Sequence, residues 1–167
     1  MKRVKLDRID LRILRELQQD GRITNIELAG RVGISAPPCL RRTAALERDG
    51  YIRGYHADVA ADKLGYNITV FTFVSLTNHA EHDLMEFAAR ANTWPMVREC
   101  YMMTGDADFV IRIVAESWES FQRFLTHQLA AAPNVAHVKS APAMECTKFE
   151  PGIPIEDKCE SDVKAAE

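Results

Sequence analysis

The segment from Thr24 to Gly50 constrains the fold of this chain more than any other part of its sequence. It contains two short helical patterns that meet at Gly33, a residue suited to the left-handed conformation of a tight turn. Thr24 is an expected N-cap of the first pattern, and Glu27 three residues later completes a capping box. Ser35 is the expected N-cap of the second pattern. Two helices joined in this way predict a helix-turn-helix, whose second helix enters the major groove of DNA.

The second helix of this motif is expected to run from Ser35 to Arg48. Its first turn tolerates Pro37 and Pro38, because the backbone N–H groups that prolines lack would have no helical partner there. At about 100° per residue, Cys39 and Leu46 share an inward face with Thr43. The residues expected on the opposite face are Pro38, Arg41, Ala45 and Arg48, with Arg42 on the flank.

Exposed arginines behind a rigid helix N-terminus suit contacts to phosphates and base edges. An ordinary three-helix bundle with a solvated arginine face would show the same periodicity, so the pattern alone leaves that alternative open. A helix over residues 9–18, capped by Asp7, completes the bundle. The residues that we expect to contact DNA are Ser35, Pro37, Pro38, Arg41, Arg42 and Arg48.

After about Leu64 the sequence alternates between strand and helix patterns. Their β-α-β-β-α-β order is the split ferredoxin-like arrangement. The fold class is therefore expected to be α+β, with an N-terminal winged helix-turn-helix domain followed by a ferredoxin-like domain. Strands are expected over residues 67–76, 97–104, 109–115 and 135–147, and helices over residues 81–91 and from the Ser117 cap through Trp118, Phe121, Phe124, Leu125 and Leu129.

Three segments are expected along the chain. Residues 1–63 form the DNA-binding domain and end in Tyr51–Ala57, which reads as a short wing or connecting ribbon. Residues 64–155 form the ferredoxin-like domain, and residues 156–167 form a flexible acidic tail. Charge supports this division, because residues 1–62 carry a net charge of +3 and residues 63–167 one of −6.

The strands of the second domain are apolar on both faces. In the first strand Val70 and Val74 point one way, whereas Phe71 and Phe73 point the other. Two helices can cover only one face of the sheet, and a large exposed apolar patch is a liability. A second copy of the same sheet is the simplest cover, so we expect a homodimer with two-fold symmetry.

Several function classes find no support in the sequence. There is no apolar run of the length that a membrane span needs and no secretory apolar core, so a cytoplasmic protein is expected. None of the four cysteines forms a C-x-x-C pair. His79 and His82 have no third ligand candidate nearby, and no catalytic set is apparent. We therefore expect no catalytic residues, no metal and no cofactor.

Several motifs in this order and spacing resemble the Lrp/AsnC family of transcriptional regulators, also called feast/famine regulators. In the first domain they are L-D-R-I-D-L-R-I-L-R-E-L, D-G-R-I-T-N-I-E-L-A, V-G-I-S, P-C-L-R-R, L-E-R-D-G and I-R-G-Y. In the second domain they are P-M-V-R-E-C-Y, T-G-D-A-D-F and F-E-P-G-I-P-I. The resemblance covers residues 6–155, nearly the whole chain.

The resemblance implies a regulator that binds double-stranded operator or promoter DNA and responds to a small-molecule effector. The effector is expected to be an amino acid or a related metabolite, bound at the interface between second domains. Family members form homodimers that commonly assemble to octamers. The family's effector loop corresponds here to Thr104–Asp108, and the expected effector-binding residues are Met102, Thr104, Gly105, Asp106 and Asp108.

Two other functions stay open at this point. Siroheme decarboxylases resemble the same two-domain plan but bind a tetrapyrrole and act as enzymes. A sensor whose first domain docks on another protein is the second alternative. Since the sequence shows no paired carboxylates or nucleophile–base set, we expect a regulator and not an enzyme.

Overall fold

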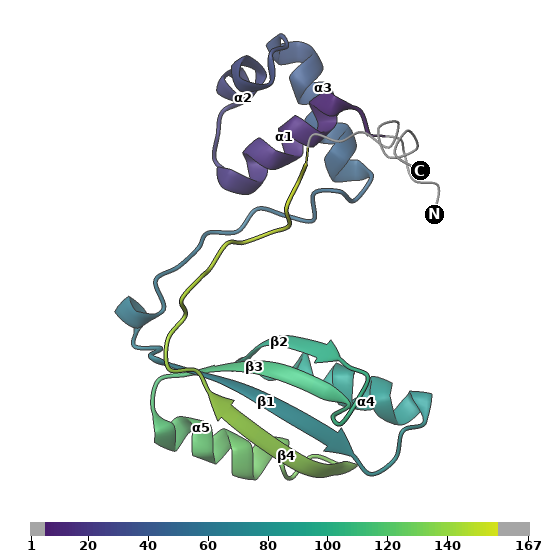
Figure 1. Ribbon diagram of the computed structural model, residues 1–167, viewed down its shortest axis with the longest axis vertical. Coiled ribbons are helices and arrows are strands. Elements are labelled where there is room, and N and C mark those ends of the chain that lie inside the picture. Colours follow the sequence, from purple (N-terminus) through teal and green to yellow (C-terminus); the bar gives the residue numbers. More distant parts are fainter. Residues whose placement is uncertain (1–5, 157–167) are drawn as a thin grey trace. The chain divides into compact units, whose positions relative to one another are not determined.

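The computed structural model of this protein describes residues 6–156 (Figure 1). They form two compact units: residues 6–58 together with residues 149–156 make the first, and Val59–Lys148 make the second. Apart from Glu156, the acidic tail expected over residues 156–167 lies outside the described residues, as does Cys159. Within the described part of the chain, no helix is both long enough and apolar enough to cross a membrane.

Three helices make up the first unit: α1 (Arg8–Gln19), α2 (Asn25–Val32) and α3 (Ala36–Arg48). The capping box predicted for α2 is confirmed, since the Thr24 hydroxyl oxygen accepts a hydrogen bond from the Glu27 backbone N–H at 3.3 Å. The Thr24 hydroxyl and then its backbone N–H donate to the Glu27 carboxylate, which lowers the pKa of Glu27. The buried core under the helices consists of Ile13, Leu28, Ala29, Val32, Cys39 and Leu46.

The turn between α2 and α3 contains the predicted left-handed glycine, because Gly33 has a φ of 79°. Its N–H donates to the Ala29 carbonyl at 3.0 Å and so closes α2. Ser35 is the N-cap residue of α3, as predicted, but its side chain makes no capping hydrogen bond. An N-cap side chain accepts from the second or third helical residue, and these are Pro37 and Pro38, which have no N–H to donate.

The second unit contains a four-stranded antiparallel sheet with the strand order β2-β3-β1-β4, which confirms the predicted ferredoxin-like topology. Its helices are α4 and α5, and α5 continues into a π-helical turn, η2 (Figure 1). The bounds in chain order are β1 (Ile68–Leu76), α4 (Glu81–Ala91), β2 (Val97–Met102), β3 (Phe109–Ala115), α5 (Trp118–Phe124), η2 (Leu125–Leu129) and β4 (Val135–Pro142).

Three strands are shorter than predicted, β1 by one residue at its start. β2 stops at Met102, two residues early, because the chain turns away to form the loop that leads to β3. β4 ends at Pro142 where Thr147 was expected, although the Ala143 N–H still donates to the Thr69 carbonyl at 2.9 Å. The segment Tyr51–Ala57 forms no strand, and a single 3₁₀ turn, η1 (Asp62–Leu64), follows it.

One face of the sheet is covered by α4 and α5, which lie on the same side of it (Figure 1). Val70, Val74 and Ile111 are fully buried there, and Phe87 of α4 and Phe124 of α5 pack against them. The stripe predicted for α5 is partly wrong, because Trp118 is 54% exposed although Phe121, Phe124 and Leu129 are buried.

The opposite face is uncovered in the single chain, and we call it the open sheet face. Strand register places Phe71 and Phe73 of β1 beside Val110 and Arg112 of β3 on this face. Tyr101 of β2 pairs with Val110 and belongs to the same face. Phe71 is 40% exposed and Tyr101 is 58% exposed, so the predicted division of apolar residues between two faces is confirmed.

Candidate nucleic-acid interface and effector loop

Of the six exposed side chains of α3, Glu47 accepts a hydrogen bond from the Tyr55 hydroxyl. The other five lie on one side of the helix: Pro37, Leu40, Arg41, Ala44 and Arg48. We call these residues the α3 surface. Helical spacing puts Pro37, Ala44 and Arg48 along its centre, with Leu40 and Arg41 on either side. Arg41 has no hydrogen-bond or ion-pair partner within residues 6–156, and Arg48 pairs with its neighbour Asp49 at 3.1 Å. Two guanidinium groups are therefore directed toward solvent from one helix.

The α3 surface is rotated relative to the surface expected from the sequence. Pro38 and Ala45 were expected to face outward, and the structure makes both half-buried. The fully buried residues Cys39 and Leu46 define the inward direction, and Pro38 lies about a quarter turn from them. Burial of Cys39 also raises the pKa of its thiol, which is consistent with a core residue.

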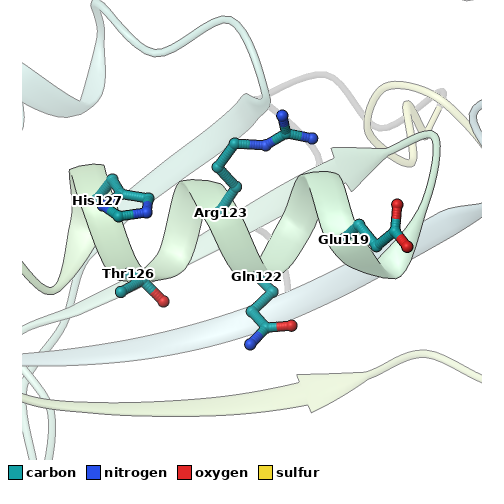
Figure 2. A pocket seen from close by; sticks show the side chains of 5 residues that line it. All are labelled: Glu119, Gln122, Arg123, Thr126 and His127. Atoms are coloured by element: carbon teal, nitrogen blue, oxygen red, sulfur yellow. The ribbon is translucent and has the colours of Figure 1, made fainter.

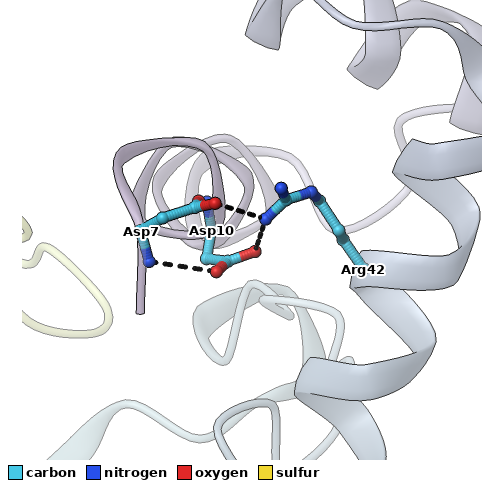
Figure 3. Close-up of polar contacts among 3 residues, drawn as sticks. All are labelled: Asp7, Asp10 and Arg42. Atoms are coloured by element: carbon cyan, nitrogen blue, oxygen red, sulfur yellow. Dashed lines mark hydrogen bonds and ion pairs between the residues drawn. The ribbon is translucent and has the colours of Figure 1, made fainter. Parts of the chain in front are cut away.

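Arg42 has partners that we did not expect. One terminal nitrogen of its guanidinium donates to Asp7 Oδ2 and to Asp10 Oδ1, each at 2.7 Å (Figure 3). The hydrogen bond to Asp10 and then that to Asp7 raise the pKa of Arg42. Partial burial raises the pKa of Asp7, but hydrogen bonds from the Asp10 backbone N–H and from Arg42 outweigh it and lower that pKa overall. Arg42 thus joins α3 to the capping box at the start of α1.

Ser35 lies at the N-terminus of α3 with an uncommitted hydroxyl. Within the described residues this hydroxyl has no hydrogen-bond partner, because the two prolines that follow remove the local donors. The Ala36 backbone N–H at the same helix end also has no acceptor among these residues. A free hydroxyl and a free N–H at a helix N-terminus suit a phosphate oxygen.

Leu40 is the residue of this surface that the sequence reasoning missed. It is 59% exposed although it lies beside the buried Cys39. An apolar residue in a helical pattern is normally assigned to the core, so Leu40 was not among the residues expected to contact DNA. Its position about 100° from Cys39 in the helix was the available signal.

The expected effector residues surround the loop between β2 and β3. Met102, Thr104, Gly105 and Asp106 are all exposed. Gly105 has a φ of 121°, and a Cβ there would meet no atom within 4 Å, so backbone conformation and not crowding favours glycine. The Asp106 carboxylate has no partner within residues 6–156. These groups are open to a ligand approaching from solvent.

Asp108 differs from the rest of the loop because its carboxylate is already engaged. Asp108 Oδ2 accepts the Leu76 backbone N–H at 2.7 Å and lies 3.2 Å from His79 Nε2. Its backbone N–H donates to the Val74 carbonyl at 3.0 Å, and its carbonyl accepts from Met103 at 2.8 Å. Asp108 therefore holds the loop against the end of β1, while Asp106 is the free carboxylate.

The open sheet face carries one charged pair among its aromatic and aliphatic residues. Arg112 Nη2 lies 2.6 Å from Glu99 Oε1, and the Tyr101 hydroxyl donates to the same carboxylate at 3.3 Å. Their pairing neutralises the charge locally. The register also places Lys139 of β4 beside Phe73 on this face. The face therefore combines apolar side chains with an internally satisfied ion pair and an exposed lysine.

A shallow depression of about 410 Å³ lies elsewhere, over the outer side of α5 and η2 (Figure 2). Its lining residues, Glu119, Gln122, Arg123, Thr126 and His127, all project from one continuous helical segment. No second element encloses it. None of the residues expected to bind DNA or effector lines it, and His79 and His82 form no group with a third metal ligand within the described residues.

Two family models match the chain. A model of winged helix-turn-helix DNA-binding domains matches residues 6–53, and a model of the Lrp/AsnC ligand-binding domain matches residues 69–153. The chain is similar to a leucine-responsive regulatory protein of Rhizobium meliloti (strain 1021), with 54% identity over 138 residues that cover 83% of this chain and 88% of that protein.

Further similarities extend over most of the chain. The Bkd operon transcriptional regulator of Pseudomonas aeruginosa is 41% identical over 151 residues, which cover 90% of this chain and 99% of that protein. A transcriptional regulator of Neisseria meningitidis, solved as a complex with L-Met, has a TM-score of 0.84 and 33% identity. That match covers 89% of this chain and 96% of the other.

Proposed function

This chain belongs to the Lrp/AsnC family of transcriptional regulators, and from that premise we propose that its first unit binds operator DNA while its second unit binds an amino-acid effector. The observation that carries the DNA-binding half is the α3 surface. It presents Arg41 and Arg48 from the helix that follows the tight turn of the helix-turn-helix, in the position of a recognition helix.

The DNA contacts divide by chemistry. Ser35 and the free helix N-terminus would take a phosphate, and Arg41 and Arg48 would contact phosphates or guanine edges. Arg42 supports the helix from the other side through Asp7 and Asp10 and does not need to touch DNA. Of the six residues expected to contact DNA, we keep Ser35, Pro37, Arg41 and Arg48 in that role.

The effector half of the proposal rests on the loop between β2 and β3. Asp106 supplies a free carboxylate for an α-ammonium group, and the exposed backbone around Gly105 supplies N–H groups for a carboxylate. The L-Met complex of the Neisseria meningitidis relative supports an amino acid as the class of ligand. Asp108 would act by holding the loop in shape.

We also propose that two chains pair through the open sheet face. Phe71, Phe73 and Tyr101 would leave water on pairing, which is the main gain in association. Such a dimer carries two recognition helices, so that one complex can bind two half-sites. Octamers assembled from such dimers would carry more DNA-binding domains. The high effective concentration of these domains would offset the weak DNA binding of each one.

The proposed role is regulation, not catalysis. The relatives are named as transcriptional regulators, which supports this choice over the siroheme-decarboxylase alternative. A tetrapyrrole absorbance band in the purified protein would argue for the enzyme. Binding to genomic DNA would place the chain in the compartment that holds the genome.

The proposal is tested by measuring mobility shift of the chain's own promoter fragment, with and without each of the twenty amino acids. A thermal-shift screen of the same amino acids identifies binders independently, because a ligand of the folded state raises apparent stability. We expect a shift at low salt and an amino acid that changes it. Asp106→Ala should remove the amino-acid response and leave DNA binding intact. No shift at any salt concentration would refute the DNA-binding half.

A further inference from the structure

Leu40 is an exposed apolar residue at the edge of the α3 surface. Its neighbours at helical spacing on that surface are Pro37 and Ala44, and both are exposed as well. None of these three side chains carries a hydrogen-bonding atom. Together they form an apolar strip that runs along α3 beside Arg41.

The strip has no structural role in the single chain. The core of the first unit is already filled by Ile13, Leu28 and Leu46, which are at most 3% exposed. Leu40 has 59% of its surface exposed and projects away from that core. Leu40 and its two apolar neighbours are therefore available to a partner outside the first unit.

The chemistry of the major groove identifies a partner. Among the four bases only thymine places a methyl group there, and apolar side chains are the groups that contact it. The α3 surface offers few alternatives for reading bases, because only Arg41 and Arg48 carry donors on it. Apolar contact is therefore the base-specific interaction available to Leu40, Pro37 and Ala44.

We propose that Leu40, together with Pro37 and Ala44, recognises thymine methyl groups and gives the chain a preference for A·T pairs beneath the middle of α3. The inference rests on the proposed DNA-binding function and adds a sequence determinant to it. Arg41 and Arg48 supply affinity through phosphates or guanine edges, while Leu40 adds selection for thymine. Leu40 and Arg41, which lie side by side on α3, thus have different roles in DNA binding.

The test removes the two contacting groups one at a time. An operator duplex selected by the wild-type chain from a random pool is resynthesised with deoxyuridine at each thymine in turn, which deletes only the methyl group. Affinity is measured for the wild-type chain and for Leu40→Ala. Met85→Ala on α4 is the matched control, since Met85 is 58% exposed and lies in the second unit.

We expect the wild-type chain to lose about fourfold in affinity for each contacted methyl group, the value for one buried methyl. The Leu40→Ala chain should lose this effect at the thymine that Leu40 contacts and keep it at thymines contacted by Pro37 or Ala44, and Met85→Ala should behave as wild type. Two results overturn the inference while DNA binding stands: equal wild-type affinity for the thymine and uracil duplexes, or an unchanged thymine preference in Leu40→Ala. The second would point to Leu40 as a protein-docking residue. Absence of any wild-type DNA binding removes both proposals.

Discussion

Arg41 and Arg42 are adjacent in the sequence but have different surroundings. The Arg41 guanidinium has no partner within residues 6–156, whereas Arg42 is held by two aspartates of α1. One helical step of about 100° separates a solvent-directed arginine from one at the edge of the core. An arginine in a recognition helix can therefore stabilise the helix and not contact DNA.

Exchange of each arginine for alanine should separate these roles. Arg42→Ala leaves Asp7 and Asp10 without their shared cation, and we expect it to lower the free energy of unfolding of the first unit by about 0.5–1 kcal/mol, since both pairs are partly solvated. Arg41→Ala should leave stability unchanged and weaken DNA binding. Urea denaturation followed by helical circular dichroism measures the first effect, and an equal loss of stability in both variants would contradict the assignment.

The same cluster makes stability depend on pH. The pKa of Asp7 is lowered in the folded chain, so its charged form is favoured and its contribution is complete above the ordinary value of 3.8. That contribution is lost as the pH falls through the lowered pKa. We expect the melting temperature to fall below about pH 4, and to fall less steeply in Asp7→Asn, which keeps a capping oxygen but cannot titrate. Identical pH profiles for the two proteins would rule out Asp7 as a contributor.

At the level of elements, helix starts were predictable from short capping patterns. The patterns at Thr24 and Ser117 correspond to the observed starts of α2 and α5, because a cap depends on residues three apart. The Ser35 side chain makes no capping hydrogen bond for an equally local reason, because two prolines occupy the positions of the donors. Strand ends were less predictable, since they depend on the partner strand as well as on the residue itself.

Two connecting segments are fixed to helices of the first unit, one to α3 and the other to α1, and neither contact was visible in the sequence. The Tyr55 hydroxyl donates to Glu47 at 2.8 Å, and burial followed by that hydrogen bond raises the pKa of Tyr55 to about 12. Gln18 exchanges two hydrogen bonds with the backbone of Ile153, at 2.7 and 3.1 Å. The second contact joins residues 135 positions apart, which no local pattern reports.

Gly152 makes the contact at Ile153 possible. It has a φ of 92°, and a Cβ there would overlap the Gln18 side-chain amide. We therefore expect Gly152→Ala to release residues 149–156 from α1, which limited proteolysis of the full chain would detect as faster cleavage in that segment. Gly30→Ala is a matched control, because a Cβ there meets nothing within 4 Å. Equal cleavage rates in Gly152→Ala and wild type would show that the segment is held by other means.

For the molecule as a whole, the open sheet face is the apolar surface that a single chain leaves exposed to water. Alternation in β1 and β3 predicted two apolar faces, and the covering helices confirmed which face is buried. The Arg112–Glu99 pair on the other face was not predicted, because its two residues lie on different strands. A single chain defines the residues of the pairing surface, whereas the arrangement of two chains depends on the contacts between them.

A charge on the open sheet face should keep two chains apart. We expect Phe71→Glu to convert the oligomer into monomers, because the new carboxylate would lose its water on pairing. Light scattering of the full chain at micromolar concentration measures the change. Met85→Glu places the same charge on an exposed helix residue and should leave the oligomer intact. A wild-type chain that is monomeric, or a Phe71→Glu chain that is not, contradicts the dimer.

The salt dependence of operator binding by the wild-type chain and by Arg41→Ala/Arg48→Ala shows most directly whether α3 contacts DNA. Each phosphate contact contributes about 0.9 to the slope of log affinity against log salt concentration. We predict that the double variant keeps its thermal stability and that its slope falls by up to about 1.8 per bound head, while Arg123→Ala on α5 changes neither. An unchanged slope in the double variant would show that α3 does not carry the contact with DNA.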